Sequence, residues 1–395
     1  MECIFKDSIT AIVPKVASWR HYLHANPEPS FAEFATTEYI IEQIKDLPDI
    51  VYTRPIPTGL VATLDTGKTG PTIALRADID ALKIQEDSGV PFTSKVDGVM
   101  HACGHDAHTA MLIGVMHVMC EHRAELTGKF VFIFQPAEED PPGGAKPLVE
   151  KGVLDGVDAI IGQHVASIVD VGKVEVSPGF NAANTDTFTI KVMGKSGHAS
   201  RPQKCLDPIP VAAEIVTALQ QIVARFVPPT DPAVVSITYF QSGTTHNIIP
   251  DEAVLKGTVR SFAPEVRSLI EDKIKSIATG IATAVGLKAE VIYDRGYDAL
   301  YNDEKFTKAF IAMADDLYGA GTCFKPTLSL GGEDFSAYLQ KVPGCFYHIG
   351  SASDKMGPRY IGHSCHFIID EAMFPMGITL MINGALLFQK LVENK

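Results

Sequence analysis

The chain has 395 residues, of which 46% are apolar and 21% charged, and its formal net charge at pH 7 is −13. A chain of this length forms two domains more often than one. The negative charge is offset by no cluster of lysine and arginine residues. This balance argues against a nucleic acid or an anionic membrane surface as the partner.

The first residues contain neither a basic segment nor a long apolar core, so we expect no signal peptide. No apolar run approaches the ~20 residues that a bilayer-spanning helix requires, so we expect no membrane partner. The seven cysteines have no repeating spacing. This pattern fits a reducing compartment better than a disulfide framework, and we therefore expect a cytoplasmic protein.

The first half of the chain alternates between the patterns of helices and strands. In chain order it predicts helices at 9–23 and 36–47, strands at 60–64 and 72–78, a helix after Asp106 with its body at 110–119, and strands at 129–135 and 159–163. Asp106 is expected to cap its helix. Such alternation predicts an α/β fold with a mostly parallel sheet that is covered on both faces.

From residue 185 the pattern changes to the strict alternation of a sheet with one open face. It predicts strands at 185–193, 233–240, 252–262 and 289–293, with helices at 209–226 and 265–285, and then helices at 303–318 and 371–391 around a strand at 344–349. The middle elements follow the β-α-β-β-α-β order of a ferredoxin-like domain. We therefore predict a catalytic domain in two parts, 1–183 and 299–395, with a domain inserted at 184–298.

Groups that bind metal ions follow several of the predicted strands. Cys103 and His105 lie in a loop before a helix, Glu138 and Glu139 follow a wholly apolar strand, and His164 follows another. Thiolate, imidazole and carboxylate groups together favour a divalent transition metal. Because the carboxyl ends of parallel strands meet at one edge of a sheet, we interpret these residues as one metal site. The residues alone do not decide which of the two glutamates would bind metal and which would act as a base.

Two other chemistries have little support in the sequence. No Gly-x-Ser-x-Gly motif is present, which argues against a serine hydrolase of that type. The segment 66–69 is similar to the end of a phosphate-binding loop, but Ala62 occupies the position of its first glycine.

The chain resembles the M20 metallopeptidase family, in the aminoacylase/amidohydrolase branch of N-acyl-amino-acid deacylases and hippurate hydrolases. The resemblance covers nearly the whole chain and depends on a set of short motifs. These are Leu75–Leu82 (LRADIDAL), Met100–His108 (MHACGHDAH), Phe134–Glu139 (FQPAEE), Gly194–Ala199 (GKSGHA), Asn247–Asp251 (NIIPD), Gly257–Arg260 (GTVR), Gly331–Phe335 (GGEDF) and Gly362–His363.

The resemblance implies a two-metal catalytic domain and an inserted lid domain through which the protein forms a homodimer. It implies five metal ligands, which are Cys103, His105, Glu139, His164 and His363. It also implies Glu138 as the general base and Asp78 as a residue that braces a ligand. Chemistry alone does not exclude His366, three residues after His363, from the ligand set.

The resemblance also assigns residues of the inserted domain and of the segment that follows it. It implies that His198 reaches the active site of the partner subunit and stabilises the oxyanion. It implies that Asn247 and Arg260 hold the substrate's carboxylate and that Gly331 and Gly332 let the backbone approach the substrate. From the residues alone, an exposed loop histidine without a catalytic role is the favoured interpretation of His198.

The expected reaction is the removal of an acyl group, in the first place acetyl, from an N-acyl-L-amino acid by two divalent ions of zinc, manganese, cobalt or nickel. A carboxypeptidase or dipeptidase of the same family is the main alternative. A non-catalytic ligand-binding member is the second alternative, but the intact Glu138 and His363 argue against it.

Overall fold

The computed structural model describes residues 4–328 and 330–393. They form two compact units, and each is described by itself. The main unit contains the chain up to Asn181, Tyr301–Thr327 and the chain from Asp334 onward, and the inserted unit contains Ala182–Leu300 and Leu328–Glu333. The segment 328–333 was expected in the catalytic domain, but it packs with the inserted unit.

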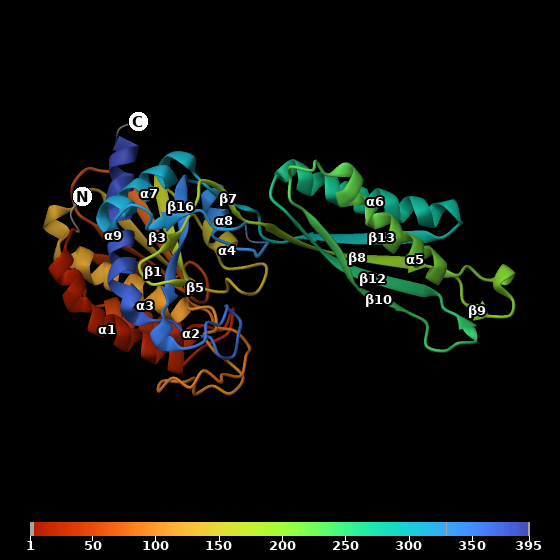
Figure 1. Cartoon of the computed structure of the whole chain (residues 1–395), viewed down its shortest axis with the longest axis horizontal. Helices are drawn as coiled ribbons and strands as arrows, with labels where there is room; N and C mark the ends of the chain where they lie inside the picture. Colours follow the sequence, from red (N-terminus) through yellow and green to blue (C-terminus); the bar gives the residue numbers. More distant parts are fainter. Residues whose placement is uncertain (1–3, 329, 394–395) are drawn as a thin grey trace. The chain divides into compact units, whose positions relative to one another are not determined.

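The main unit is built on one mixed sheet with helices around it (Figure 1). Its strands lie in the order β1 (Ile50–Thr53), β2 (Leu60–Asp65), β4 (Lys129–Gln135), β3 (Thr72–Asp78), β5 (Ala159–Asp170), β16 (Gly344–Ala352), β6 (Val174–Glu175) and β15 (Cys323–Phe324). Strands β4, β3, β5 and β16 run parallel, whereas β1 and β2 pair antiparallel. The predicted mixed, mostly parallel sheet is confirmed.

The helices bury both faces of this sheet. They are α1 (Lys6–Ala25), α2 (Phe34–Ile44), α3 (His105–Glu121), α4 (Ala145–Glu150), α7 (Glu304–Tyr318), α8 (Ser336–Leu339) and α9 (Phe374–Glu393). Successive side chains of β4, from Phe130 to Phe134, are almost wholly buried although they point to opposite faces. The apolar run of this strand therefore exists because it lies inside a three-layer fold.

Several local predictions for the main unit were wrong. Helix α3 begins at His105, so Gly104, with a φ of 89°, is the N-cap and Asp106 lies inside the first turn. Instead Asp106 accepts a hydrogen bond from Nε of Arg20 and pairs with His24, because both lie on the helix packed against it. Strand β5 continues to Asp170, so His164 lies within the strand rather than after it. Strand β1 was not predicted.

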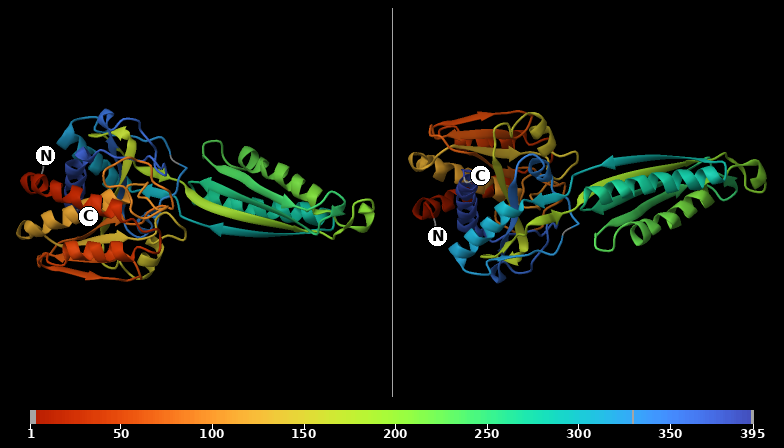
Figure 2. Two further views of the ribbon diagram at one scale, coloured as in Figure 1. Left: turned by 90° about the horizontal axis from the view of Figure 1, so that it is seen from below. Right: turned by 90° about the horizontal axis from the view of Figure 1, so that it is seen from above.

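The inserted unit is an antiparallel sheet with two helices on one face (Figure 2). Its strands lie in the order β10 (Val234–Ser242), β12 (Glu252–Ser261), β8 (Asn184–Met193) and β13 (Lys288–Arg295), with α5 (Pro208–Leu219) and α6 (Pro264–Ala284) packed on them. The alternating side chains of Phe188, Ile190 and Val192 share a core with both helices. The predicted ferredoxin-like arrangement is confirmed, although α5 ends at Leu219 and a separate π-helical turn follows at Ile222–Phe226.

Two helical stretches are long and apolar enough to cross a membrane, judged by length and composition alone. The sequence had predicted no such stretch. They are Pro208–Phe226 and Glu371–Glu393. The second is mostly buried within the core of the main unit, as expected for the core helix of a globular protein. The absence of a membrane partner stays a prediction.

Candidate metal centre and active site

The parallel strands of the main unit bring the predicted chemistry to one edge of the sheet. Asp78, at the end of β3, is paired with Gln135, at the end of β4, and Glu138 and Glu139 follow β4 directly. Helix α3 begins with His105, and His164 lies on neighbouring β5. Strand ends in parallel register therefore gather residues that lie far apart in the sequence.

The five predicted ligands lie together in the main unit. The Sγ of Cys103 is 3.4 Å from Nε2 of His164, and Nε2 of His363 is 3.2 Å from Oε2 of Glu139. Ligand atoms lie within 4.8 Å of one another in three overlapping groups, which are Cys103–His105–His164, Cys103–Glu139–His363 and His105–Glu138–Glu139. These groups contain every predicted ligand and the predicted base.

The donor atoms of this cluster fit a divalent metal. The Nε2 of His105 and the Oε1 of Glu139 are buried 3.8 Å apart, and neither has a hydrogen-bond partner. Unpaired buried polar atoms are costly, and a cation bonded to both would remove that cost. The separations are comparable with those between two donors that share one ion at bond lengths of ~2.0–2.3 Å.

The protonation of the cysteine and histidines also depends on a cation. Burial, with the carboxylate of Glu139, raises the pKa of the Cys103 thiol well above its usual value. A bound cation reverses this effect, because it stabilises the thiolate. For His105, burial would lower the pKa, but the carboxylates of Asp78 and Asp80 outweigh burial and raise it.

The ring of His164 is set to offer one nitrogen to a metal. Burial, with the neighbouring His108, lowers the pKa of His164 and keeps the ring neutral. Its Nδ1 lies 2.7 Å from the carbonyl of Val165 and donates to it, which leaves Nε2 facing Cys103. A hydrogen bond at the opposite nitrogen is the usual way to orient a histidine ligand.

His363 and His366 share a loop, but the structure separates their surroundings. His363 has a φ of 68°, and its backbone N–H donates to the carbonyl of Ala102, 2.8 Å away. This conformation turns its ring toward Glu139. The Nδ1 of His366 instead contacts the carbonyl of Asp87, and His366 occurs in none of the groups above.

Two carboxylates at the end of β3 support the cluster, and the sequence analysis assigned a role to only one of them. Asp80 accepts from Nδ1 of His105 through Oδ1, at 3.2 Å, and from the backbone N–H of Glu139 through Oδ2, at 3.0 Å. Asp78, the expected brace, lies 3.8 Å from the other ring nitrogen of His105. The residue that braces this predicted ligand from behind is therefore Asp80.

Asp78 is itself held by two buried partners that the sequence analysis did not single out. Its Oδ1 lies 2.6 Å from Nδ1 of His108, and Arg76 donates to its Oδ2 from Nη1, also at 2.6 Å. The Nε2 of His108 accepts from the backbone N–H of Val165. Because both of its ring nitrogens are used, His108 acts as a structural link between β3 and β5. The alternating run Arg76, Asp78, Asp80 was the available sequence signal.

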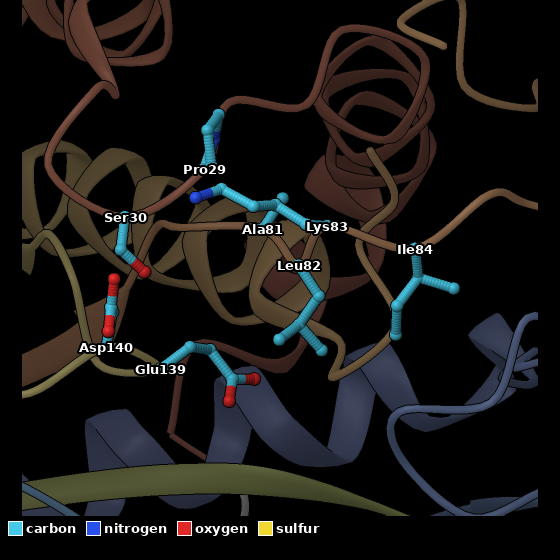
Figure 3. Close-up of a pocket in the computed structure, with 8 residues that line it drawn as sticks. All are labelled: Pro29, Ser30, Ala81, Leu82, Lys83, Ile84, Glu139 and Asp140. Atoms are coloured by element: carbon cyan, nitrogen blue, oxygen red, sulfur yellow. The ribbon is translucent and has the colours of Figure 1, made fainter. Parts of the chain in front are cut away.

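A pocket of about 230 Å³ opens beside the cluster (Figure 3). Its lining is Pro29, Ser30, Ala81, Leu82, Lys83, Ile84, Glu139 and Asp140. Its walls are mixed: Pro29, Ala81, Leu82 and Ile84 are apolar, whereas Ser30, Lys83, Glu139 and Asp140 are polar or charged. The pocket can therefore hold a small apolar group next to the candidate metal centre.

The remaining predicted residues lie in the inserted unit, in two separate places. His198 and Asn247 are exposed on the ribbon formed by β9 (Gly197–His198) and β11 (Ile248–Ile249). The Nδ1 of His198 accepts from the backbone N–H of Ser200 at 3.1 Å. Arg260 is half-buried near the end of β12, where its Nε donates to the carbonyl of Leu330.

The two glycines follow Leu330 and pack closely. A side chain at Gly332 would meet Thr185 at 2.6 Å, and the carbonyl of Gly331 accepts from the N–H of Ala183. Glycine is therefore required at position 332 by the packing inside the inserted unit.

The structure does not bring Asn247 and Arg260 of one chain together. Asn247 precedes β12, which begins at Glu252 and reaches Arg260 near its end. At ~3.3 Å per residue, the strand separates them by roughly 25 Å. One chain therefore cannot use both residues on the same small carboxylate. The expectation that Asn247 and Arg260 hold the substrate's carboxylate stays a prediction, and it requires one residue from each of two subunits.

Comparison with known proteins agrees with this site. Residues 74–384 match the model of peptidase family M20/M25/M40. The N-acetylcysteine deacetylase of Bacillus subtilis is 43% identical over 338 residues, which cover 85% of this chain and 88% of that protein. The thermostable carboxypeptidase 2 of Saccharolobus solfataricus is 38% identical over 375 residues, which cover 94% of this chain and 95% of that protein.

A solved structure has the same fold. The YXEP protein of Bacillus subtilis, described as a dinuclear metal-binding peptidase of family M20, superposes with a TM-score of 0.84 at 38% identity and covers 96% of this chain and 99% of that chain. The family model spans most of the chain, and these relatives match nearly its full length. The chain therefore belongs to peptidase family M20, in the amidohydrolase/aminoacylase branch, and is a metal-dependent hydrolase.

Proposed function

We propose that the protein removes a short acyl group from an N-acyl-L-amino acid. The observation that carries this proposal is the convergence of Cys103, His105, Glu139, His164 and His363, with Glu138 beside them. Two divalent ions bound there would lower the pKa of a water molecule. Zinc, manganese, cobalt and nickel all suit this mixed donor set.

Glu138 is the proposed general base and acid. Its side chain is buried and belongs to a group with His105 and Glu139, so it lies next to the predicted ligands. In the proposed reaction Glu138 takes a proton from the attacking water and later gives it to the nitrogen of the leaving amine. The products are a carboxylate and a free amino acid.

The two places in the inserted unit fit two different tasks. Arg260 offers a planar guanidinium to the substrate's carboxylate, a contact that is typically strong because it is charge-assisted. His198 and Asn247 lie roughly 25 Å along β12 from it. We therefore propose that this ribbon serves the active site of a second subunit in a homodimer, where His198 stabilises the oxyanion.

The pocket beside Glu139 supports an acyl substrate. Its volume of about 230 Å³ and the apolar part of its wall, formed by Ala81, Leu82 and Ile84, suit a short acyl chain, while Lys83 and Asp140 also line it. The name of one relative, N-acetylcysteine deacetylase, agrees with this substrate class. A carboxypeptidase is the second candidate, because a relative of that name matches 94% of the chain.

The test is a substrate panel measured with each of the four metals. N-acetyl amino acids, N-benzoyl amino acids and dipeptides with the same C-terminal residues are compared by kcat/KM. We expect the N-acetyl series to have the highest values. A consistent preference for dipeptides would replace the deacylase by a peptidase, and no turnover of any member would refute both.

A further inference from the structure

Glu33 is a wholly buried carboxylate outside the predicted site. It lies immediately before α2, and none of its surface is exposed to solvent. Its Oε1 accepts two backbone hydrogen bonds, from the N–H of Phe31 at 3.0 Å and from the N–H of Ala137 at 2.8 Å. One oxygen atom therefore joins the loop before α2 to the turn after β4.

Both residues that donate to Glu33 have a left-handed backbone. The φ of Phe31 is 65° and that of Ala137 is 54°. Residues other than glycine adopt this conformation at a cost in free energy, and it persists where the surroundings enforce it. The hydrogen bond that the N–H of Ala137 donates to Glu33 is therefore placed where it can enforce the strained conformation of Ala137.

Ala137 directly precedes Glu138 and Glu139, and its turn is held at two further points. The carbonyl of Ala137 accepts from the N–H of Gly144 at 3.1 Å, and the N–H of Glu139 donates to Asp80 at 3.0 Å. Since φ of Ala137 sets the direction of the chain after it, a change there moves both glutamates. The Asp80 contact alone restrains only Glu139.

We propose that Glu33 is a positioning residue that keeps Ala137 in the left-handed conformation and thereby aims Glu138 and Glu139 at the metal centre. This inference rests on the proposed function, because it takes Glu138 as the base and Glu139 as a ligand. The orientation of Glu138 and of Glu139 would then depend on a residue that lies more than a hundred positions earlier in the chain. Residues that orient metal ligands commonly change metal affinity or activity ~10–100-fold when they are replaced.

The same geometry predicts which substitution is tolerated. Burial, with the charge of Asp80, raises the pKa of Glu33 to about 7, so a neutral side chain is compatible with this position. Glutamine keeps an acceptor oxygen of the same reach, whereas leucine fills the space without an acceptor. Glu33→Gln should therefore preserve the turn, and Glu33→Leu should release it.

The test compares these variants with a matched control in the same loop. Glu28 also accepts backbone hydrogen bonds, from Ala35 and Thr36, but it has no recorded contact with the 136–139 turn. Zinc affinity is measured by competition with a chromophoric chelator, and kcat and KM on the best N-acyl substrate. Glu33→Leu should lose ~10–100-fold in zinc affinity and in kcat, with KM little changed. Glu33→Gln and Glu28→Leu should stay near the wild type in both.

A double-mutant cycle tests the route through Ala137. Glycine adopts positive φ freely, so Ala137→Gly should reduce the loss that Glu33→Leu causes. Strictly additive losses, or wild-type zinc affinity in Glu33→Leu, would overturn the proposal. If Glu33→Leu does not fold, Glu33→Asp, whose shorter side chain cannot reach both amides, takes its place in the cycle. The zinc measurement needs no substrate, so it remains decisive even if the deacylase proposal fails.

Discussion

The metal cluster of the main unit and the ribbon of the inserted unit differ in how much of their own structure holds them. His105 and Glu139 are each fixed by Asp80, and His164 is fixed by the carbonyl of Val165. His198, in contrast, is exposed, and its side-chain hydrogen bonds go to Ser200, two residues away. The cluster is a preorganised site, whereas the ribbon presents side chains outward.

This difference indicates whether a residue acts within its own chain or on a second chain. A largely buried cluster with unpaired donor atoms has a need for a ligand of its own, because a bound cation would satisfy those atoms. An exposed histidine on a two-stranded ribbon has no such requirement and acquires a role only against another surface. Predictions for the main unit should therefore hold within one chain, and those for the ribbon should depend on a second chain.

The largest expected effect is on Glu138. Glu138→Gln removes the proton acceptor and keeps the shape of the side chain, so kcat should fall ~10²–10⁴-fold. Bound metal, measured by mass spectrometry after dialysis, should stay at the wild-type level because the five ligands are intact. Glu150→Gln, an exposed carboxylate on α4, is the control and should have wild-type turnover. Near-normal turnover of Glu138→Gln would assign the base elsewhere.

The sequence predicted this part of the site well for a physical reason. Parallel strands end at one edge of a sheet, so Cys103, His105, the pair Glu138 and Glu139, and His164 could be gathered from strand patterns alone. His363 could not, because it lies in a polar loop and reaches Glu139 only through a positive φ. The choice between Glu138 and Glu139 also needed the family resemblance, since adjacent residues share every pattern.

The second prediction tests whether the ribbon needs another chain. His198→Ala should lower kcat ~10²–10³-fold, as expected for the loss of one oxyanion donor. Mixed with Glu138→Gln, it should regain activity, because a heterodimer then contains one site with Glu138 from one chain and His198 from the other. His246→Ala, an exposed histidine before β11, should neither lose activity alone nor be needed for the rescue.

The rescue separates the two arrangements of the ribbon. If His198 served its own chain, every site in such a heterodimer would lack either the base or the histidine. Subunit exchange is shown by mass spectrometry of differently tagged chains. If subunits exchange but activity is not regained, the ribbon acts within its own chain. The metal cluster and the ribbon would then no longer differ in their need for a second chain.

The third prediction concerns Arg260, which lies in the inserted unit but away from the ribbon. Arg260→Gln should raise KM ~10–100-fold for N-acyl amino acids, in line with the loss of a charged hydrogen bond. The same variant should have little effect on the corresponding N-acyl amino-acid amides, which lack the carboxylate. Equal losses on both series would show that Arg260 acts through its hydrogen bond to Leu330 rather than on the substrate.

The inserted unit was the harder part to predict, and Asn247 shows why. Strand order and alternation gave the ferredoxin-like sheet, because its core alternates with period two. The function of Asn247 and Arg260 depends on how far apart β12 places them. A short sequence motif contains no information about that separation. Both residues belong to family motifs, yet the length of one strand prevents the Asn247 and Arg260 of the same chain from serving one carboxylate together.

The smallest expected effect is on the free energy of unfolding. It tests how strongly α1 is held to α3, the helix that begins with the predicted ligand His105. His24 lies on α1, where its Nδ1 is 2.8 Å from Asp106 and its Nε2 is 3.0 Å from Glu86. Burial would lower the pKa of His24, but the two carboxylates outweigh burial and raise it to about 9. In the unfolded chain the pKa is ~6.5.

Because the folded pKa is the higher one, the stabilisation by His24 is complete below pH 6.5 and is lost as the pH rises through about 9. The free energy of unfolding, measured with urea without metal, should fall by a further ~2 kcal/mol over this range relative to His24→Gln. His117, whose pKa burial lowers, is essentially neutral in both the folded and the unfolded state above pH ~7.5, about one unit above the unfolded pKa. His117→Gln should therefore keep the wild-type slope. A His24→Gln protein with that same slope would show that the pair of His24 with Asp106 is not charged, which leaves Arg20 as the charged partner of Asp106 across α1 and α3.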